Sequence, residues 1–215
     1  MQEIGVINLK NYMIINDKLT APIFLNGVIH EHFDETMYNE GMGYSWNRPF
    51  FNKDEFPKEL WLITTNKIEF DYYKNFLGHI VEERFLNLID ESNSLKDFVI
   101  AKLNIVSPRG KSKVKKNYFF IKYFNGISLV DYDQSDFISR EVPENKVFKS
   151  EGVFVEKYQK VVFGQTDLDV FCLKDLKLSS YMFCSEKFMQ QCIALKLKGF
   201  KFIELDEVAT HINSR

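Results

Sequence analysis

The sequence predicts an α+β fold, built from a mixed or antiparallel sheet with two related strand-helix-strand units. Short apolar runs of strand length outnumber the helical patterns. A strand-helix-strand pattern occurs twice. The regular alternation of strands and helices that a doubly wound parallel sheet needs is missing. A chain of 215 residues is long enough to bury a sizeable core.

The C-terminal unit is the clearest of these patterns. Strands are expected at 169–173 and at 181–184. Ser185 then stands where a helix N-cap belongs, because its hydroxyl can accept a hydrogen bond from a backbone N–H of the first turn. We expect the helix to run to Gly199, which can take the left-handed conformation that ends a helix, and a strand to follow over 200–205. The predicted apolar face of this helix consists of Phe188, Met189, Cys192, Ile193 and Leu197.

A weaker version of the same unit occurs earlier in the chain. Residues 80–89 match residues 183–192 in pattern, with Phe85 aligned to Phe188. The match is either a duplication or a coincidence between two amphipathic helices that each precede a strand. In this unit the sequence predicts a strand over Glu69–Tyr73, a helix over Val81–Ile89 and a strand over Phe98–Val106.

The N-terminal quarter has a different character. Strands are expected around Gly5–Leu9 and Pro22–Ile29, with a turn at Asn16–Asp17. Residues 31–58 combine glycines and prolines with large rings, which is typical of an irregular segment that covers a core. An aromatic-rich loop for partner contact is the alternative. The run Leu60–Thr64 predicts the next strand.

The strongest strand of the chain is predicted at Tyr118–Phe124. Both of its faces are apolar, so we expect it in the middle of a sheet that is covered on both sides. Asn125-Gly126 favours a tight turn, which predicts that Ile127–Val130 pairs back as a hairpin. Phe148–Val155 and Lys160–Phe163 are further candidate strands.

Charge and composition argue against several kinds of partner. The net charge is −2 and the pI about 6.1, so the chain as a whole offers no electrostatic attraction for nucleic acid or for an anionic membrane. No apolar run approaches the ~20 residues of a membrane span. The first residues contain neither a basic stretch nor a long apolar one, so we expect a cytoplasmic protein.

The three cysteines fit the same compartment. Cys172, Cys184 and Cys192 are odd in number and lack metal-ligand spacing, which argues against a disulfide framework and against a structural zinc site. Each lies in an apolar strand or helix pattern. We therefore expect three buried thiols that act as small hydrophobic side chains.

One histidine cluster suggests metal chemistry. His30, His32 and Asp34 form an H-x-H-x-D pattern after an apolar run, as in metallo-β-lactamase-like hydrolases, where such residues bind metal. Only His79 and His211 remain to complete a site. The alternative interpretation, an exposed turn after a strand, is the one we favour.

A second cluster suggests RNA binding. Tyr118 and Phe120 partly imitate an aromatic RNA-binding strand, and the basic loop Ser107–Lys116 could meet phosphates. Asn117 and Phe119, however, replace the small residues of that pattern. We favour a buried strand beside a solvated loop.

Several segments resemble a known family. Residues 181–205, with the Ser-Glu-Lys-Phe helix start and the Leu-Lys-Gly-Phe-Lys-Phe exit, resemble immunity proteins of bacterial polymorphic toxin systems. The match is to the immunity protein 43 group, which is related to immunity protein 11. Asp71-Tyr-Tyr followed by residues 80–85, and Tyr118-Phe-Phe leading to residues 131–135, also fit, so the resemblance spans roughly residues 60 to 206.

The resemblance implies a function and a domain organisation. It implies a protein that binds a cognate toxin and blocks it without catalysis, with no cofactor. It places an immunity-like α+β domain at 59–215, with strands and an aromatic loop at 1–58 packed on it, or one continuous domain over 1–215. The matched motifs determine the fold, so they do not locate the toxin-binding surface. A metal-dependent hydrolase and an RNA-binding module stay open as alternatives.

Overall fold

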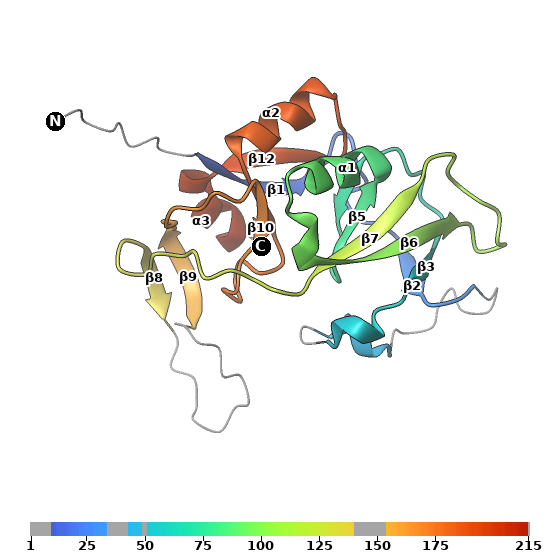
Figure 1. Ribbon diagram of the computed structural model, residues 1–215, viewed down its shortest axis with the longest axis horizontal. Helices are drawn as coiled ribbons and strands as arrows, with labels where there is room; N and C mark the ends of the chain where they lie inside the picture. Colours follow the sequence, from blue (N-terminus) through green and yellow to red (C-terminus); the bar gives the residue numbers. More distant parts are fainter. Residues whose placement is uncertain (1–9, 34–42, 49–50, 140–153, 215) are drawn as a thin grey trace.

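The computed structural model describes residues 10–33, 43–48, 51–139 and 154–214, and in these residues the fold is α+β, as predicted. They form three sheets and three α-helices (Figure 1). The helices are α1 (Glu83–Glu91), α2 (Glu186–Ala194) and α3 (Leu205–Asn213). Short 3-10 turns lie at Ser45–Asn47, Lys53–Glu55 and Leu95–Asp97.

The four-stranded sheet combines one strand from the N-terminal part with three from the C-terminal part. Its strands are β1 (Asn11–Asn16), β10 (Val170–Cys172), β11 (Met182–Ser185) and β12 (Phe200–Glu204). Their order is β10-β11-β1-β12, and all neighbours are antiparallel. In the register, Met13 of β1 lies opposite Phe183 on one side and Ile203 on the other.

The six-stranded sheet is mixed. Its strands are β2 (Gly27–His30), β3 (Glu59–Thr64), β4 (Tyr72–Lys74), β5 (His79–Glu82), β6 (Phe98–Val106) and β7 (Tyr118–Tyr123). Their order is β2-β3-β6-β7-β5-β4, with β3 and β6 parallel and all other neighbours antiparallel. A separate hairpin joins β8 (Asp136–Ser139) to β9 (Val155–Lys160).

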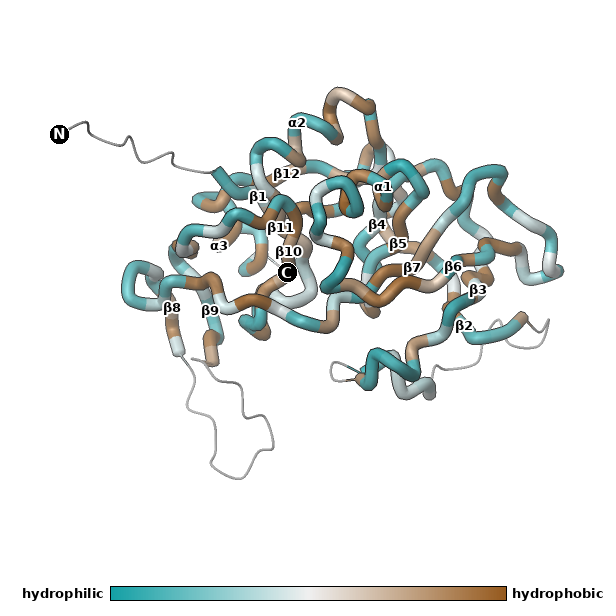
Figure 2. The backbone as a smooth tube through the Cα atoms, in the orientation of Figure 1, coloured by the Kyte–Doolittle hydropathy of each residue, from teal (hydrophilic) through white to brown (hydrophobic). Residues whose placement is uncertain are grey.

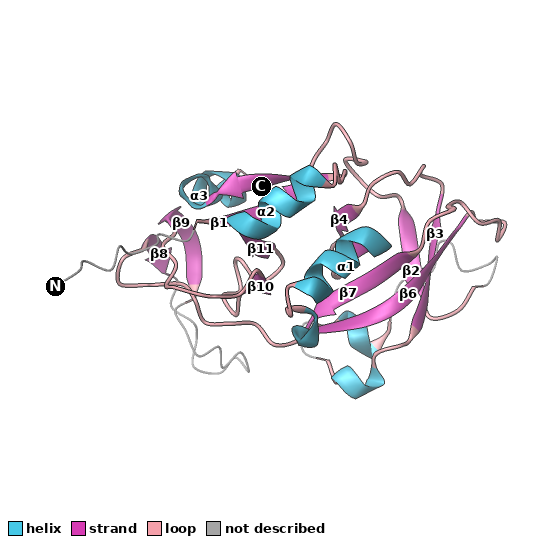
Figure 3. Ribbon diagram, turned by 45° about the horizontal axis from the view of Figure 1, so that its top comes forward, coloured by secondary structure: helices cyan, strands magenta, loops and turns pink. Residues whose placement is uncertain are grey.

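The central core lies between the two large sheets and contains side chains from both. Helices α1 and α2 lie next to each other over this core (Figures 1 and 3), and the rings of Phe85 and Phe188 meet edge-on at 5.6 Å. Alternate residues of β1 and β7 point into it, because successive side chains of a strand face opposite sides of a sheet.

Two further cores cover the outer faces of the sheets. Behind the four-stranded sheet, α3 and the β8-β9 hairpin cover β1, β10 and β11. Behind the six-stranded sheet, Tyr44, Trp46, Phe51 and Phe56 pack on β7, and Trp46 meets Phe120 at 5.8 Å between ring centres. The described part of the 31–58 segment therefore covers a core, as the sequence predicted.

The position predicted for the strongest strand is confirmed. β7 lies between β6 and β5, and Figure 2 shows hydrophobic residues along part of its course. Tyr118 and Phe120 point to the outer core, while Phe119 and Ile121 point to the central one. Both faces are covered, which explains why both read as apolar in the sequence.

The start of α2 is as predicted, but its end is not. Ser185 accepts a hydrogen bond from the backbone N–H of Phe188 at 3.2 Å. The helix ends at Ala194, and Lys196 takes the positive φ of 52° that was expected of Gly199. Of the predicted apolar face, Ile193 is exposed.

Gly199 has a different role from the one predicted. Its φ is +102°, and a Cβ atom there would overlap Phe70 Cβ and the carbonyl oxygen of Tyr72. The glycine is needed because the backbone before β12 passes directly against the segment that enters β4.

The start of α1 also differs from the prediction. Residues 79–82 form β5, so the helix begins at Glu83 and not at Val81. Glu82 occupies the N-cap position, and its carboxylate accepts a hydrogen bond from the backbone N–H of Arg84 at 3.1 Å. A carboxylate replaces the usual hydroxyl there and also suits the positive end of the helix dipole.

The predicted hairpin after Asn125-Gly126 is wrong. The chain crosses to the edge of the other large sheet, where Ile127 bridges Leu173 just after β10, and Val130 then bridges Phe163 outside the named strands. Gly126 lies so close to the backbone of this sheet that a Cβ would be 2.9 Å from the nitrogen of Lys174. The glycine therefore allows a close crossover and not a tight turn.

The predictions at the two ends of the chain differ most from the structure. Two predicted segments lie outside the described residues: the strand at Gly5–Leu9 and residues 148–153 of the strand at Phe148–Val155. Two observed elements were not predicted: the strand β1 at Asn11–Asn16 and the helix α3 at Leu205–Asn213. Elsewhere, strands 60–64 and 98–106 are confirmed. The strands predicted at 22–29, 69–73 and 160–163 are displaced or shortened: β2 begins at residue 27, β4 at 72, and β9 ends at 160.

The two large sheets share an order of elements. In one, the β4-β5 hairpin leads into α1, and β7 lies between β5 and β6. In the other, the β10-β11 hairpin leads into α2, and β1 lies between β11 and β12. A relation by duplication stays a prediction, as does the domain boundary near residue 58.

All three cysteines are buried and free, as predicted. Burial raises the pKa of each thiol, so they stay neutral within the core.

Gly199→Ala should lower the free energy of unfolding by about 3 kcal/mol, because the new methyl group meets backbone and the positive φ is strained. Gly164→Ala is the control, since its nearest neighbour would be an ordinary contact at 3.7 Å. Urea denaturation measures both, and equal stabilities would contradict the close-approach role.

His79 predicts an acid-dependent stability. It is buried beside Tyr72, with 2.9 Å between its Nδ1 and the Tyr72 hydroxyl, and burial followed by the Lys74 charge lowers its pKa from 6.5 to about 3. The unfolded chain therefore binds more protons between these values, so stability falls as pH falls from about 6.5. The contribution of His79 should decline by about 2 kcal/mol between pH 6.5 and 4.5.

His79→Gln keeps a hydrogen-bonding side chain but does not titrate in this range. Its unfolding free energy should change less with pH than that of the wild type over the same interval. Identical pH dependence in both proteins would show that His79 is protonated freely in the folded state.

Candidate partner-binding surface

The two described histidines of the H-x-H-x-D pattern lie in different environments. His30 is buried at the end of β2, where its Nδ1 lies 3.2 Å from the Tyr44 hydroxyl and its ring meets the Tyr44 ring edge-on. His32 is exposed, and Asp34 lies outside the described residues. Across the described part of the chain, no three His, Cys, Asp or Glu side chains are grouped so that they could hold a metal ion.

The two rings of the predicted RNA-binding strand are buried. The Tyr118 hydroxyl donates a hydrogen bond to the carbonyl oxygen of Phe70 at 2.7 Å, and Phe120 stacks on Phe56. Stacking on a base requires an open ring face. Neither ring offers one, which confirms the buried strand that we favoured from the sequence and argues against base stacking by these two rings.

A short loop over residues 17–25, which we call the anchored loop, is held by its own side chains. Asp17 Oδ1 accepts from the backbone N–H of Leu19 at 3.1 Å, and Asp17 Oδ2 accepts from the Thr20 hydroxyl at 2.7 Å. These two bonds, Thr20 first, lower the pKa of Asp17. The carboxylate therefore stays charged and keeps the turn closed at neutral pH.

The anchored loop is also tied to both large sheets. The Asp17 N–H donates to the carbonyl oxygen of Gly199 at 3.0 Å, and the Gly199 N–H donates to the Thr20 hydroxyl at 3.0 Å. At the other end, the Leu25 N–H donates to the Tyr73 hydroxyl at 3.0 Å. The loop is thus fixed where the sheets meet.

This fixed loop exposes large apolar side chains. Leu19 is 93% exposed, Ile23 77% and Phe24 76%. Phe76 is 95% exposed in the β4-β5 turn, which is connected to the start of the loop because Asn16 exchanges two hydrogen bonds with the Lys74 backbone. Single exposed apolar residues are normal on a surface, but several on one anchored segment are typical of a contact site.

A groove of about 610 Å³, which we call the lysine groove, begins at the anchored loop. Its walls contain five lysines and one glutamate: Lys67, Lys113, Lys115, Lys116, Lys198 and Glu69. Leu19 and Thr20 of the loop, Ile68, Val114 and Tyr118 complete the lining. Positive charge is therefore gathered in one place on a chain whose net charge is −2.

A buried carboxylate lies beside this groove. Asp71 Oδ1 accepts from Lys116 Nζ at 2.8 Å and from Arg84 Nη2 at 3.0 Å, and Asp71 Oδ2 accepts from the backbone N–H of Lys198 at 2.8 Å. Burial alone raises the pKa of Asp71, but these donors outweigh it and hold the pKa below its ordinary value. Asp71 thus joins α1, the β6-β7 connection and the segment before β12.

Comparison with known protein families identifies the family of this chain. The sequence model of the family described as immunity protein 43 matches residues 13–215. The chain belongs to the immunity protein 43 family. The resemblance of residues 60–206 is therefore confirmed, and the match also includes the N-terminal quarter from residue 13. No curated protein matches the sequence.

Membership of the immunity protein 43 family implies a cognate toxin as partner. The helices of the described residues include none with the length and apolar character needed to cross a membrane. Among the described residues, the anchored loop and the lysine groove combine exposed apolar side chains with gathered positive charge.

The sequence indicated part of the groove, since the basic loop Ser107–Lys116 supplies Lys113, Lys115 and Lys116, but it did not indicate the anchored loop. Ile23 and Phe24 looked like part of a strand, because they are apolar and precede Val28 and Ile29. Asp71 entered only as part of a family pattern. The available signal was Asp17 followed three residues later by Thr20, a spacing that closes a turn through side chains.

Asp71→Asn should lower the free energy of unfolding by about 3 kcal/mol, because Arg84 and Lys116 lose their shared buried acceptor charge. Asp133→Asn, at an exposed position, is the control and should have little effect. Chemical denaturation compares them. A stability unchanged in Asp71→Asn would show that the network contributes nothing net.

Proposed function

We propose that this member of the immunity protein 43 family binds its cognate toxin in the cytoplasm and neutralises it by occlusion, without catalysis or a cofactor. Family membership supports a toxin partner. The observation that carries the proposal of a binding surface is the anchored loop, which presents Leu19, Ile23 and Phe24 to solvent from a backbone fixed at both ends.

A fixed loop favours tight binding for a thermodynamic reason. Association is opposed by the ordering of flexible segments, and a loop that is already ordered avoids that cost. Burying three large apolar side chains contributes about 6 kcal/mol, at roughly 2 kcal/mol each. That is about half of the ~12 kcal/mol of a nanomolar complex, so these residues suit the role of central anchors.

The remainder of the chain serves as scaffold in this proposal. The two strand-helix-strand units hold the surface in place, and we take the whole chain as one continuous domain. β1 supports this view, because residues 11–16 lie between β11 and β12 in one sheet.

The test requires the cognate toxin domain, which is to be sought first in the genes that neighbour this one. Co-expression with the wild-type protein should protect cells, and the two purified proteins should bind. Leu19→Ser with Phe24→Ser should weaken binding about 1,000-fold, because two apolar anchors of roughly 2 kcal/mol each are lost. Isothermal calorimetry measures the affinity.

Ile138→Ser with Ile193→Ser is the matched control, since both side chains are exposed but lie on β8 and α2. It should bind and protect as the wild type does. A wild-type protein that neither binds nor protects would overturn the proposed function. Equal weakening in both double variants would overturn the assignment to the anchored loop.

A further inference from the structure

The charges of the lysine groove are only partly compensated within the chain. Lys67 pairs with Glu69 at 2.6 Å and Lys116 with Asp71 at 2.8 Å. Among the ion pairs of the described residues, none involves Lys113, Lys115 or Lys198. The Lys113 ammonium donates to the carbonyl oxygen of Thr65 at 2.8 Å, which fixes its position but leaves its charge.

Asp71 does not neutralise these three lysines. Its two oxygens already accept from Lys116, Arg84 and the Lys198 backbone N–H, and its carboxylate is almost completely buried. Like charges gathered in one groove repel one another, and an anionic ligand relieves that repulsion. The groove therefore favours a ligand that brings several negative charges.

The groove and the apolar surface form one continuous feature. Leu19 belongs to the anchored loop and also lines the groove, next to Thr20 and Lys198. A partner that covers the exposed Leu19 side chain thus places its neighbouring residues at the groove. The groove volume of about 610 Å³ is within the range of pockets that enclose ligands.

Resting on the proposed function, we propose that the lysine groove binds an acidic segment of the toxin, a short run of Asp and Glu side chains adjoining the apolar contact at Leu19. Lys113, Lys115 and Lys198 donate charge-assisted hydrogen bonds to its carboxylates. Such contacts set the orientation of the complex and speed association, while the apolar anchors supply most of the affinity.

The lining favours an acidic protein segment over nucleic acid. The only ring in the described lining is that of Tyr118, which is buried and whose hydroxyl is bonded to Phe70. Single-stranded nucleic acid binding combines positive charge with open aromatic faces. Leu19, the exposed apolar side chain that itself lines the groove, is aliphatic and suits a protein contact.

The first experiment measures fluorescence anisotropy with a fluorescein-labelled deca-glutamate peptide at low salt. The wild type should bind, with an affinity that falls as salt rises. The triple change Lys113→Glu, Lys115→Glu and Lys198→Glu should weaken binding at least tenfold. The same three positions changed to Gln provide a second variant that removes charge without reversing it, and thermal unfolding checks that each variant is folded.

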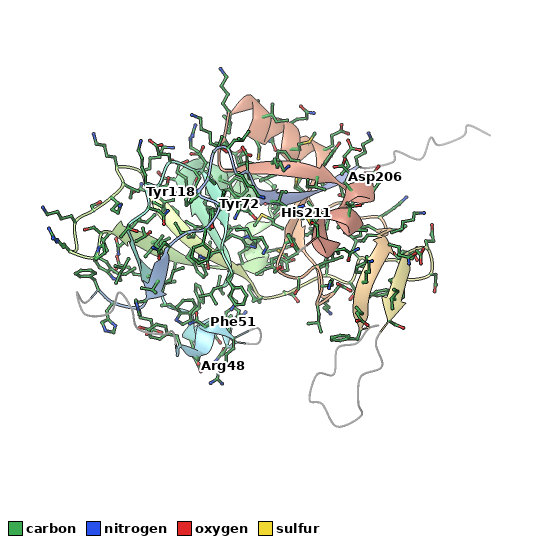
Figure 4. The ribbon with its side chains drawn as sticks, turned by 180° about the vertical axis from the view of Figure 1, so that it is seen from behind. Arg48, Phe51, Tyr72, Tyr118, Asp206 and His211 are labelled. Carbon is green, nitrogen blue, oxygen red and sulfur yellow. The ribbon has the colours of Figure 1, made fainter. Side chains whose placement is uncertain are left out.

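The matched control changes three exposed lysines elsewhere, Lys157→Glu, Lys160→Glu and Lys177→Glu. Two of them lie on β9, which packs beside α3, and Figure 4 shows the α3 residues Asp206 and His211 well away from Tyr118 at the groove. The control alters net charge equally and should bind the peptide within twofold of the wild type. Absence of peptide binding, or equal loss in the groove and control variants, would overturn the proposal.

A labelled ten-nucleotide single strand is the competing probe. Binding tighter than that of the peptide, and lost in the groove variants, would overturn the acidic segment in favour of nucleic acid. The same variants are then tested against the toxin domain. The proposal is supported if the wild type protects cells and the groove variants protect them poorly.

The toxin assay separates this inference from the proposed function. Groove variants that bind and neutralise the toxin as well as the wild type would overturn the acidic-segment proposal and leave the proposed function standing. A wild type that fails to neutralise would overturn the proposed function, and with it the assignment of the groove to a toxin.

Discussion

The contact between the two helices in the central core is the interaction on which the arrangement depends. The Phe85 ring of α1 lies 5.6 Å from Phe188 of α2, 4.9 Å from Tyr72 of β4 and 5.3 Å from Phe200 of β12. One ring thus contacts both large sheets and the second helix. Burying each of these rings stabilises the fold by about 2–3 kcal/mol. The burial requires both sheets, because each sheet covers the inner face of the other.

The join between the sheets also explains where the candidate surface lies. The Asp71 N–H donates to the carbonyl oxygen of Lys198 at 2.7 Å, and Gly199 allows the same two segments to touch. The anchored loop and the lysine groove border this join. A surface built on such densely bonded backbone is already ordered, and binding to an ordered surface avoids the free-energy cost of ordering a flexible one.

The lysine groove illustrates a limit of reading charge from composition. A net charge of −2 argues against anionic partners for the chain as a whole. Folding nevertheless brings Lys67 and Lys198 beside lysines 113, 115 and 116 of the basic loop, although these three segments are far apart in sequence. Local potential depends on positions in space, and these were absent from the sequence-level argument.

Several features of this protein could be predicted from its sequence because local interactions determine them. The cap at Ser185, the course of β6, the two apolar faces of β7 and the burial of the cysteines follow from hydrogen bonds and periodicity within a few residues. Family membership could also be inferred from the sequence, because the same local patterns are shared with the family.

Only the tertiary structure decided the rest, because long-range packing overrides local preference. β1 was not predicted, although both of its faces are apolar and it pairs with strands about 170 residues or more away in sequence. Asn125-Gly126 has the local pattern of a hairpin, yet the chain crosses to the other sheet. Gly199 has the pattern of a helix end but serves a contact between two distant segments. The candidate surface arises in the same way, since it exists only where the two sheets meet.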